Sequence, residues 1–224
     1  MGRLEVQMQV SYPEPAHPNP LFELLGNERR VVRFRKRKLI FAAGNPSDAV
    51  FLIEHGGVKL TLTSPDGREA VVAIFCAGDL FGYEAFDSAN LPRVTNAIAL
   101  TDVRLARIDR VAILRAMASR PAIHALVISL LIHRIAHLKY ELAGNLLCTS
   151  EQRLARALLL TAEIDHSDPG SAMPKISQQE LADMIGTTRQ RVNCLLQRFR
   201  KMGLINDSHG LHLNELLRNV AQLD

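Results

Sequence analysis

Residues 177–205 read SQQELADMIGTTRQRVNCLLQRFRKMGLI, and this pattern predicts two short helices joined by a tight turn. Ser177 is followed three residues later by Glu180, which is the spacing of a capping box. In that motif each side chain accepts a hydrogen bond from an otherwise unpaired backbone N–H at the helix start. Gly186 is expected to end the first helix, because glycine adopts a positive φ without strain.

The second helix has two contrasting faces. Thr187 or Thr188 is expected to cap it, and Thr187 with Gln190 has the spacing of another capping box. Its apolar face comprises Val192, Leu195, Leu196 and Phe199, and the opposite face comprises Gln190, Asn193, Gln197 and Lys201, with Arg189 at the border. Residues 187–203 hold five Lys or Arg and no Asp or Glu.

This distribution suits a helix that packs by one face and enters a DNA major groove by the other. Arginine pairs with guanine edges, and asparagine or glutamine pairs with adenine edges. The alternative is a surface helix with ordinary solvated charges. The two caps and the glycine turn favour the DNA-binding interpretation.

The same stretch resembles the winged helix-turn-helix of the cyclic AMP receptor protein (CRP/FNR) family of bacterial transcription regulators. That family places a Ser/Thr-Arg-x-x-Val run at the start of its recognition helix, and Thr188, Arg189 and Val192 match it. Gln190 stands where many members have Glu, which puts the family's usual half-site sequence in doubt. The resemblance implies base contacts by Arg189, Gln190 and Asn193, and phosphate contacts by Thr188, Arg191, Gln197, Arg198, Arg200 and Lys201.

The length and composition indicate a soluble globular chain of two modest domains. It has 224 residues, of which 22% are charged and 47% apolar. Net charge is +4, and the residues from 149 onward hold nine basic and nine acidic groups. DNA affinity must therefore come from the local placement of charge.

The cysteines and the N-terminus exclude several classes. Cys76, Cys148 and Cys194 form no metal-ligand pattern, which is typical of a reduced cytoplasmic protein. No signal peptide is recognised, and no uninterrupted apolar run reaches the ~18 residues of a membrane span. Residues 1–20 are expected to form a flexible proline-rich arm. They lack the cysteine cluster of the family's iron–sulfur members, so no such cluster is expected.

Residues 31–108 predict a β-sandwich or barrel. Short apolar runs alternate with turn glycines at Gly44, Gly56, Gly67 and Gly78, which stand 12, 11 and 11 residues apart. The runs GVKLTLTSPDGRE, AGDLFG and ALTDVRLARIDR resemble the family's β-roll sensor domain. The basic run 29–38 alternates with apolar residues, which favours the solvated face of an edge strand over a nucleic-acid patch.

Residues 121–147 predict a long helix with an apolar seam. The seam residues recur at alternating spacings of three and four: Ile128, Leu131, Ile135, Leu138 and Leu142. We interpret this helix as the interface of a homodimer, the alternative being a core helix of a monomer. His133 and His137 have the spacing of metal ligands, but with no third ligand nearby they are interpreted as surface or interface residues.

The expected fold class is therefore α+β. Residues 1–20 form the arm, 21–120 a β-roll like that of cyclic nucleotide-binding domains, 121–147 the dimerisation helix and 148–224 the winged helix-turn-helix. A short helix is expected at 21–25 and a hinge at 145–150. Thr149 and Gln152 have the spacing of a cap that opens a helix through Leu160, and an acidic loop at 165–174 follows it. A wing is expected at 205–213 and a last helix capped by Asn214 and ending near Leu223.

The expected effector pocket departs from that of the nucleotide-binding members. Those members have Gly-Glu, then Arg followed by Ser or Thr, and a Thr-Ser pair on the long helix. The corresponding positions here are Gly82, Tyr83 and Glu84, then Arg93 and Val94, and finally Lys139 and Tyr140. Only the arginine survives cleanly, which argues against cyclic AMP. The effector is left unassigned: haem held by Cys76 or His55 and an unliganded scaffold both stay open.

The sequence thus predicts a homodimeric, sequence-specific DNA-binding regulator acting on a pseudo-palindrome in the cytoplasm. The resemblance adds RNA polymerase as a partner, and no membrane partner is expected. The alternative is a cyclic-nucleotide-binding subunit that controls an enzyme through a C-terminal protein-interaction module. We find no nucleophile–base pair, paired carboxylates or phosphate loop, so the chain itself is not expected to be an enzyme.

Overall fold

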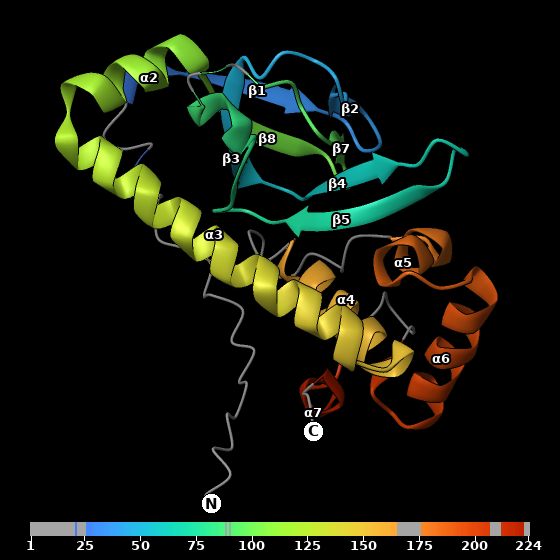
Figure 1. Ribbon diagram of the computed structural model, residues 1–224. Coiled ribbons are helices and arrows are strands. Elements are labelled where there is room, and N and C mark those ends of the chain that lie inside the picture. The colour runs from blue at the N-terminus through green and yellow to red at the C-terminus, as the bar shows by residue number, and fades with distance from the viewer. Residues whose placement is uncertain are drawn as a thin grey trace, which may run out of the picture.

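A computed structural model describes residue 21 and residues 26–87, 89, 91–164, 176–206 and 212–221 (Figure 1). The arm at 1–20, the acidic loop at 165–174 and the tip of the predicted wing lie outside the described residues. The architecture is the expected one: an antiparallel β domain, one long helix and a C-terminal helical domain. Of the short helix predicted at 21–25, only Leu21 is described, and it is helical and fully buried.

The β domain consists of two four-stranded antiparallel sheets. The first has the order β1-β8-β3-β6 and the second β2-β7-β4-β5. Their bounds are β1 Arg29–Phe34, β2 Leu39–Phe41, β3 Ala49–His55, β4 Val58–Thr63, β5 Glu69–Phe75, β6 Leu80–Phe81, β7 Asn96–Ala99 and β8 Val103–Asp109, with 3₁₀ turns η1 Gly26–Glu28 and η2 Tyr83–Phe86. The basic run begins in β1, which lies at the edge of its sheet as predicted.

The two sheets pack on a cluster of aromatic side chains. Phe51 stacks on Phe81 with ring centroids 5.1 Å apart, and Phe41 and Phe75 lie 6.0 and 5.9 Å from the same ring. The turn between β3 and β4 is pressed against this core. Gly56 has φ 84°, and a Cβ there would collide with the carbonyl oxygen of Asp102. A glycine is thus required at this predicted turn position.

Helix α2 (Arg110–Ser119) leads into α3 (Pro121–Leu147), which runs diagonally from the β-roll to the C-terminal domain (Figure 1). One side of α3 is covered by the roll: Ile123 and Val127 are buried there, and Leu131 packs partly against the same core. Leu131 of the predicted seam therefore also contacts the roll, because the face toward the roll and the seam adjoin on one helix.

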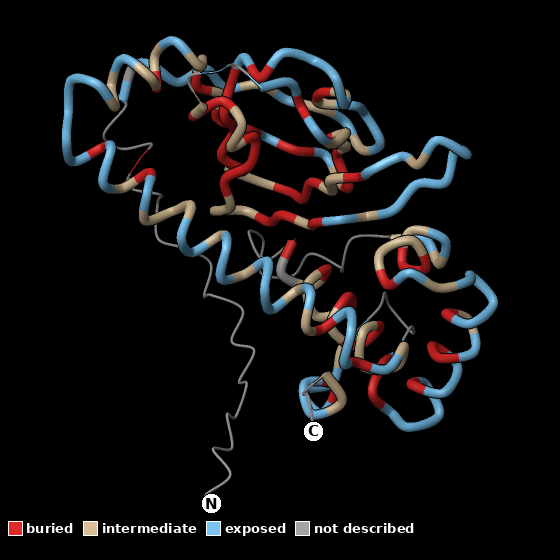
Figure 2. Tube along the Cα trace, viewed as in Figure 1, coloured by how far each residue is buried: buried red, intermediate tan, exposed pale blue. Residues whose placement is uncertain are grey.

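Much of α3 is exposed (Figure 2). The exposed large apolar residues along the helix are Ile128, Ile132, Ile135, Leu138, Tyr140, Leu142, Leu146 and Leu147. Among the described residues, α3 alone is long and apolar enough to cross a membrane by length and composition. The sequence holds no unbroken apolar run of about 18 residues, because polar residues are scattered along α3, but the average hydropathy of the helix passes this test.

The C-terminal domain is built around one apolar core. Helices α4 (Ser150–Glu163), α5 (Gln178–Ile185), α6 (Arg189–Lys201) and α7 (Leu217–Ala221) surround it, with the short strands β9 (Ile205–Asn206) and β10 (His212–Leu213). The strands pair antiparallel at the base of the predicted wing. The Asn214 Oδ1 accepts from the Leu216 N–H at 3.0 Å in the turn that leads into α7, and the predicted end of this helix near Leu223 lies outside the described residues.

The hinge between the two domains is short. Helix α3 ends at Leu147 and α4 begins at Ser150, so only Cys148 and Thr149 intervene, both extended. Thr149 forms the predicted capping box with Gln152. Side chains also bridge the domains directly: Arg37 of the roll lies 3.7 Å from Glu180 of α5. The C-terminal domain therefore rests against the β-roll.

Candidate functional site

The start and end of α5 are set by the predicted residues. The Ser177 N–H donates to Glu180 Oε2 at 2.7 Å, and the Glu180 N–H donates to Ser177 Oγ at 3.2 Å. Burial acts to raise the pKa of Glu180, but the hydrogen bonds from Ser177 bring that pKa below its ordinary value. Gly186 closes the helix with φ 63°, in the left-handed region.

Thr188 caps α6. The Arg191 N–H donates to Thr188 Oγ1 at 3.2 Å. The capping box proposed between Thr187 and Gln190 was wrong. The Thr187 N–H donates to the Ala182 carbonyl at 3.0 Å, so Thr187 belongs to the turn that leaves α5, one residue before the cap.

Replacing Ser177 by alanine tests how much the capping box holds α5 in place. We expect a loss of about 1 kcal/mol in the free energy of unfolding, because the Glu180 N–H then loses its acceptor. Urea denaturation followed by circular dichroism measures it. Ser177→Thr is the matched control and should stay close to the parent. If the alanine variant were as stable as the parent, water would be replacing Ser177 as the acceptor for the Glu180 N–H.

Helix α6 buries one face and presents the other to solvent. Val192, Leu195, Leu196 and Phe199 are buried in the core of the domain. Arg189 and Gln190 are exposed at the N-terminal end of the helix. Asn193 is half-buried, and its Oδ1 accepts from Gln178 Nε2 of α5 at 3.3 Å. The three residues predicted to read bases therefore lie on one accessible stretch, with Asn193 braced by the preceding helix.

The residues predicted to contact phosphate are all exposed: Thr188, Arg191, Gln197, Arg198, Arg200 and Lys201. Arg198 has an internal counter-ion. Its Nη1 lies 2.8 Å from Glu151 Oε2 of α4. This ion pair ties α6 to α4 and partly offsets the charge that Arg198 could offer to a phosphate.

Arg93, the one family-like residue of the expected effector pocket, is buried and already paired. Its Nη1 lies 3.0 Å from Glu84 Oε2, and its Nη2 donates to the Ala49 carbonyl. The guanidinium carbon lies 4.3 Å from the centroid of the Phe41 ring, in a cation–π contact. Burial lowers the pKa of Arg93, and the Glu84 carboxylate opposes that change. The positive charge is thus neutralised from within the protein.

The other residues of the expected pocket are only partly brought together. Gly82 lies against Arg93, since a Cβ at Gly82 would be 2.8 Å from Arg93 Nη1. Tyr83 packs on Phe86 in the core, and burial raises its pKa. Val94 points outward and is 64% exposed. Lys139 and Tyr140 lie farther along α3, on its exposed face. The structure therefore groups Gly82, Glu84 and Arg93, whereas Lys139 is exposed and Tyr140 lines a different cavity, described next.

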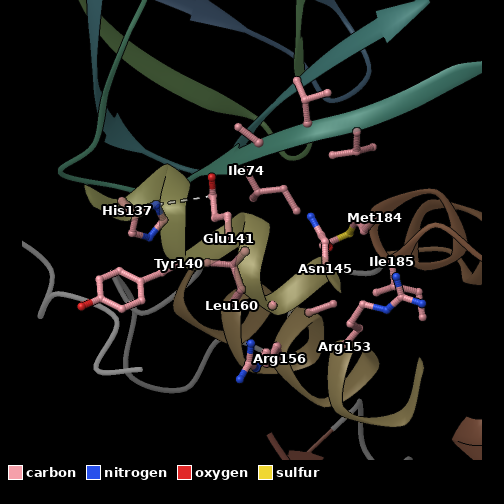
Figure 3. Close-up of a pocket in the computed structure, with 15 residues that line it drawn as sticks. Ile74, His137, Tyr140, Glu141, Asn145, Arg153, Arg156, Leu160, Met184 and Ile185 are labelled. Atoms are coloured by element: carbon pink, nitrogen blue, oxygen red, sulfur yellow. Dashed lines mark ion pairs between the residues drawn. The ribbon is translucent and has the colours of Figure 1, made fainter. Parts of the chain in front are cut away.

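Sequence reasoning missed a second hollow, which we name the interdomain cavity (Figure 3). Residues from β5, α3, α4 and α5 line it, among them Ile74, Glu141, Arg153, Arg156 and Met184. These segments are far apart in the chain, so no local pattern marks the cavity. The side chain of His137 joins its lining, with Nδ1 3.4 Å from Glu141 Oε1.

Comparisons with known proteins agree with this arrangement. Residues 31–120 match the model of the cyclic nucleotide-binding domain, and residues 152–223 match that of the Crp-like helix-turn-helix domain. A CRP-like cAMP-activated global transcriptional regulator of Mycobacterium tuberculosis is 31% identical over 185 residues, which cover 81% of this chain and 82% of that protein. The HTH-type transcriptional regulator Cmr, from the same species, is 30% identical over 196 residues, covering 84% and 77%.

Solved structures show the same fold. TTHB099, a CRP-family transcriptional regulator from Thermus thermophilus, superposes with a TM-score of 0.71 at 26% identity, covering 86% of this chain and 98% of that one. FixK2 from Bradyrhizobium japonicum superposes with a TM-score of 0.74 at 20% identity, covering 88% and 97%. The likeness spans the β-roll, the long helix and the helical domain together.

Proposed function

Because this chain belongs to the CRP/FNR family of DNA-binding transcription regulators, we propose that it acts in the cytoplasm as a homodimer that reads a pseudo-palindromic DNA site. The observation that carries the proposal is the geometry of α6. Its apolar face is buried, and Arg189 and Gln190 stand exposed at its capped N-terminus. Helix-turn-helix proteins contact base edges with this end of the recognition helix.

The uncovered face of α3 supports the homodimer. Ile128, Ile135, Leu138 and Leu142 are between 45% and 59% exposed in the single chain. An apolar stripe of this length is costly in water and is buried when two such helices pair. A two-fold axis along α3 would also give two copies of α6, which matches two half-sites about 34 Å apart.

Cyclic AMP is not the effector in this proposal, although the mycobacterial relative is described as cAMP-activated. A cyclic phosphate would have to displace Glu84 from Arg93, and it would find no hydroxyl at Val94. A buried charge that already has a carboxylate partner gains little from exchanging it for a phosphate. Contact of the DNA-bound dimer with RNA polymerase is part of the proposal and rests on the family resemblance.

Selection of bound sequences from random duplex DNA tests the function. Fluorescence anisotropy on the selected duplex then gives the affinity at fixed salt, with and without cyclic AMP. We expect tight binding that requires both half-sites and that the nucleotide leaves unchanged. Binding that appears only with the nucleotide would refute the effector part of the proposal. Failure to enrich any sequence over random DNA, in either condition, would contradict the DNA-binding function.

Arg189→Ala tests the assignment of base readout. We expect a loss of about 1–3 kcal/mol in binding free energy, together with relaxed preference at one base pair of each half-site. Lys201→Ala is the matched comparison. It should weaken binding equally on all sequences. It should also reduce the slope of the logarithm of the binding constant against the logarithm of salt concentration by about one, as expected for one lost phosphate contact. If Arg189→Ala instead weakened binding equally on all sequences, Arg189 would be a phosphate contact and not a base contact.

A further inference from the structure

The interdomain cavity has the size and lining of a small-molecule site. Its volume is about 320 Å³, within the range of roughly 300–1,000 Å³ typical of ligand pockets. Much of its wall is apolar, with contributions from Val72, Ile74, Leu160 and Met184. Figure 3 shows Ile74, Leu160 and Met184 around a common space between β5 and the helices. His137 and Glu141 lie at one end of it and Met184 at the other.

The polar part of the lining carries an excess of positive charge. Glu141 is flanked by Arg134 and His137, with its Oε2 3.5 Å from Arg134 Nη2 and its Oε1 3.4 Å from His137 Nδ1, although Oε2 accepts no hydrogen bond within the described residues. Arg153 and Arg156, both on α4, have no carboxylate within ion-pair distance among the described residues. The carboxylate of the cavity thus has an arginine beside it, whereas Arg153 and Arg156 have no anion beside them.

Both arginines also leave donors unused. Arg153 Nε and Arg156 Nη2 are buried, and neither has a hydrogen-bond partner within the described part of the chain. Arg156 Nε donates to the Ala221 carbonyl at 2.7 Å, which anchors that side chain, and its Nη1 lies against Gly144 of α3. Buried donors without partners are rare in folded proteins. Two of them on one cavity wall indicate an acceptor that comes from outside the chain.

We propose that the interdomain cavity binds a small organic anion, whose carboxylate or phosphate group is held by Arg153 and Arg156 and whose apolar part contacts Ile74, Leu160 and Met184. Charge-assisted hydrogen bonds from guanidinium groups suit either anion. The site is distinct from the pocket around Arg93, which is closed by Glu84.

The position of the cavity gives such a ligand a regulatory effect, a consequence that rests on the proposed DNA-binding function. Its walls belong to the β-roll and α3 on one side of the Cys148–Thr149 hinge and to α4 and α5 on the other. Closing around a ligand therefore favours one placement of α6 relative to the dimer helix. A ligand that prefers that placement shifts the population toward it.

Isothermal titration calorimetry on the full chain without DNA tests the site. The probes are benzoate and phenyl phosphate, which carry the two candidate anions on the same ring, and benzyl alcohol as their neutral counterpart. We expect saturable binding of at least one anionic probe and none of benzyl alcohol. Arg153→Gln should weaken binding about tenfold, because one charge-assisted contact is lost. Val72→Glu, a change on the exposed surface of β5, should weaken it similarly by repulsion.

Arg68→Gln is the matched control. Arg68 lies in the β4–β5 hairpin, is 85% exposed and pairs with Asp66, so its removal should leave probe affinity unchanged. Absence of saturable binding by both anions would overturn the proposal, and so would affinities of the Arg153→Gln and Val72→Glu variants as high as that of the parent. Anisotropy on the selected duplex then measures the regulatory effect, and a DNA affinity that saturating probe leaves unchanged would contradict it. If the chain bound no DNA even without the probe, the proposed function would be contradicted, and the calorimetric result would still stand.

Discussion

Leu138→Arg is expected to convert the dimer into monomers and to weaken binding to the palindromic site by at least about a hundredfold. Leu138 is 45% exposed at the middle of the apolar face of α3, so the change leaves the core of the chain intact. In a dimer, however, two arginines would meet across the two-fold axis, in apolar surroundings and without counter-ions. Once the protomers separate, each half-site is bound alone, and the gain from linking two binding events is lost.

Sedimentation velocity and anisotropy measure the two effects separately. His124→Arg is the matched control, since it adds the same side chain to an exposed position on the same helix. It should remain dimeric with parental DNA affinity. If Leu138→Arg sedimented as a dimer, the interface would lie elsewhere than on α3. Far-ultraviolet circular dichroism of both variants verifies that the helix content is unchanged.

Glu84→Gln is expected to cost about 3 kcal/mol in the free energy of unfolding. It removes the nearest carboxylate from Arg93, which is 2% exposed and leaves no water to take its place. Breaking a buried pair by removing one partner is costly because the remaining charge stays desolvated. The Ala49 carbonyl, the Phe41 ring and Asp48 at 3.9 Å offset part of the loss. The corresponding fall in melting temperature is about 6–12 °C.

Glu69→Gln is the control for this experiment. Glu69 is an exposed carboxylate of β5 that pairs with Lys59, and its loss should cost under about 1 kcal/mol. The Glu84→Gln variant should also gain affinity for phosphate-bearing nucleotides, because Arg93 is then left without its internal counter-ion. If the Glu84→Gln variant were as stable as the parent, the Glu84 carboxylate would not be what stabilises the buried charge of Arg93.

The features that could be predicted from sequence are those set by neighbouring residues. The capping boxes at Ser177 and Thr149 and the left-handed Gly186 depend on three or four adjacent positions, and each forms as expected. The cap of α6 was ambiguous between Thr187 and Thr188, because the phase of the turn decides which hydroxyl faces the helix start. The bonded partner of Thr187, Ala182, lies in the preceding helix, where sequence spacing gave no sign of it.

The features that could not be predicted depend on how distant segments pack. The sequence placed Glu84 out of register with the family pattern, but its pairing with Arg93 requires the η2 turn to aim the carboxylate inward. Leu131 fits the heptad pattern as well as Leu138 does, and only the position of the roll against α3 separates them. The interdomain cavity requires four elements to meet, which no periodicity encodes.

The order of domains along the chain has a consequence for protein synthesis. The β-roll and α3 precede the DNA-binding domain, and domains generally fold as they leave the ribosome, N-terminal first. The exposed apolar face of α3 is therefore synthesised before α6. Two chains growing on the same messenger RNA are then close enough to pair while they are still being translated. Pairing at that stage would favour partners from one transcript and limit mixing with other regulators of the same fold.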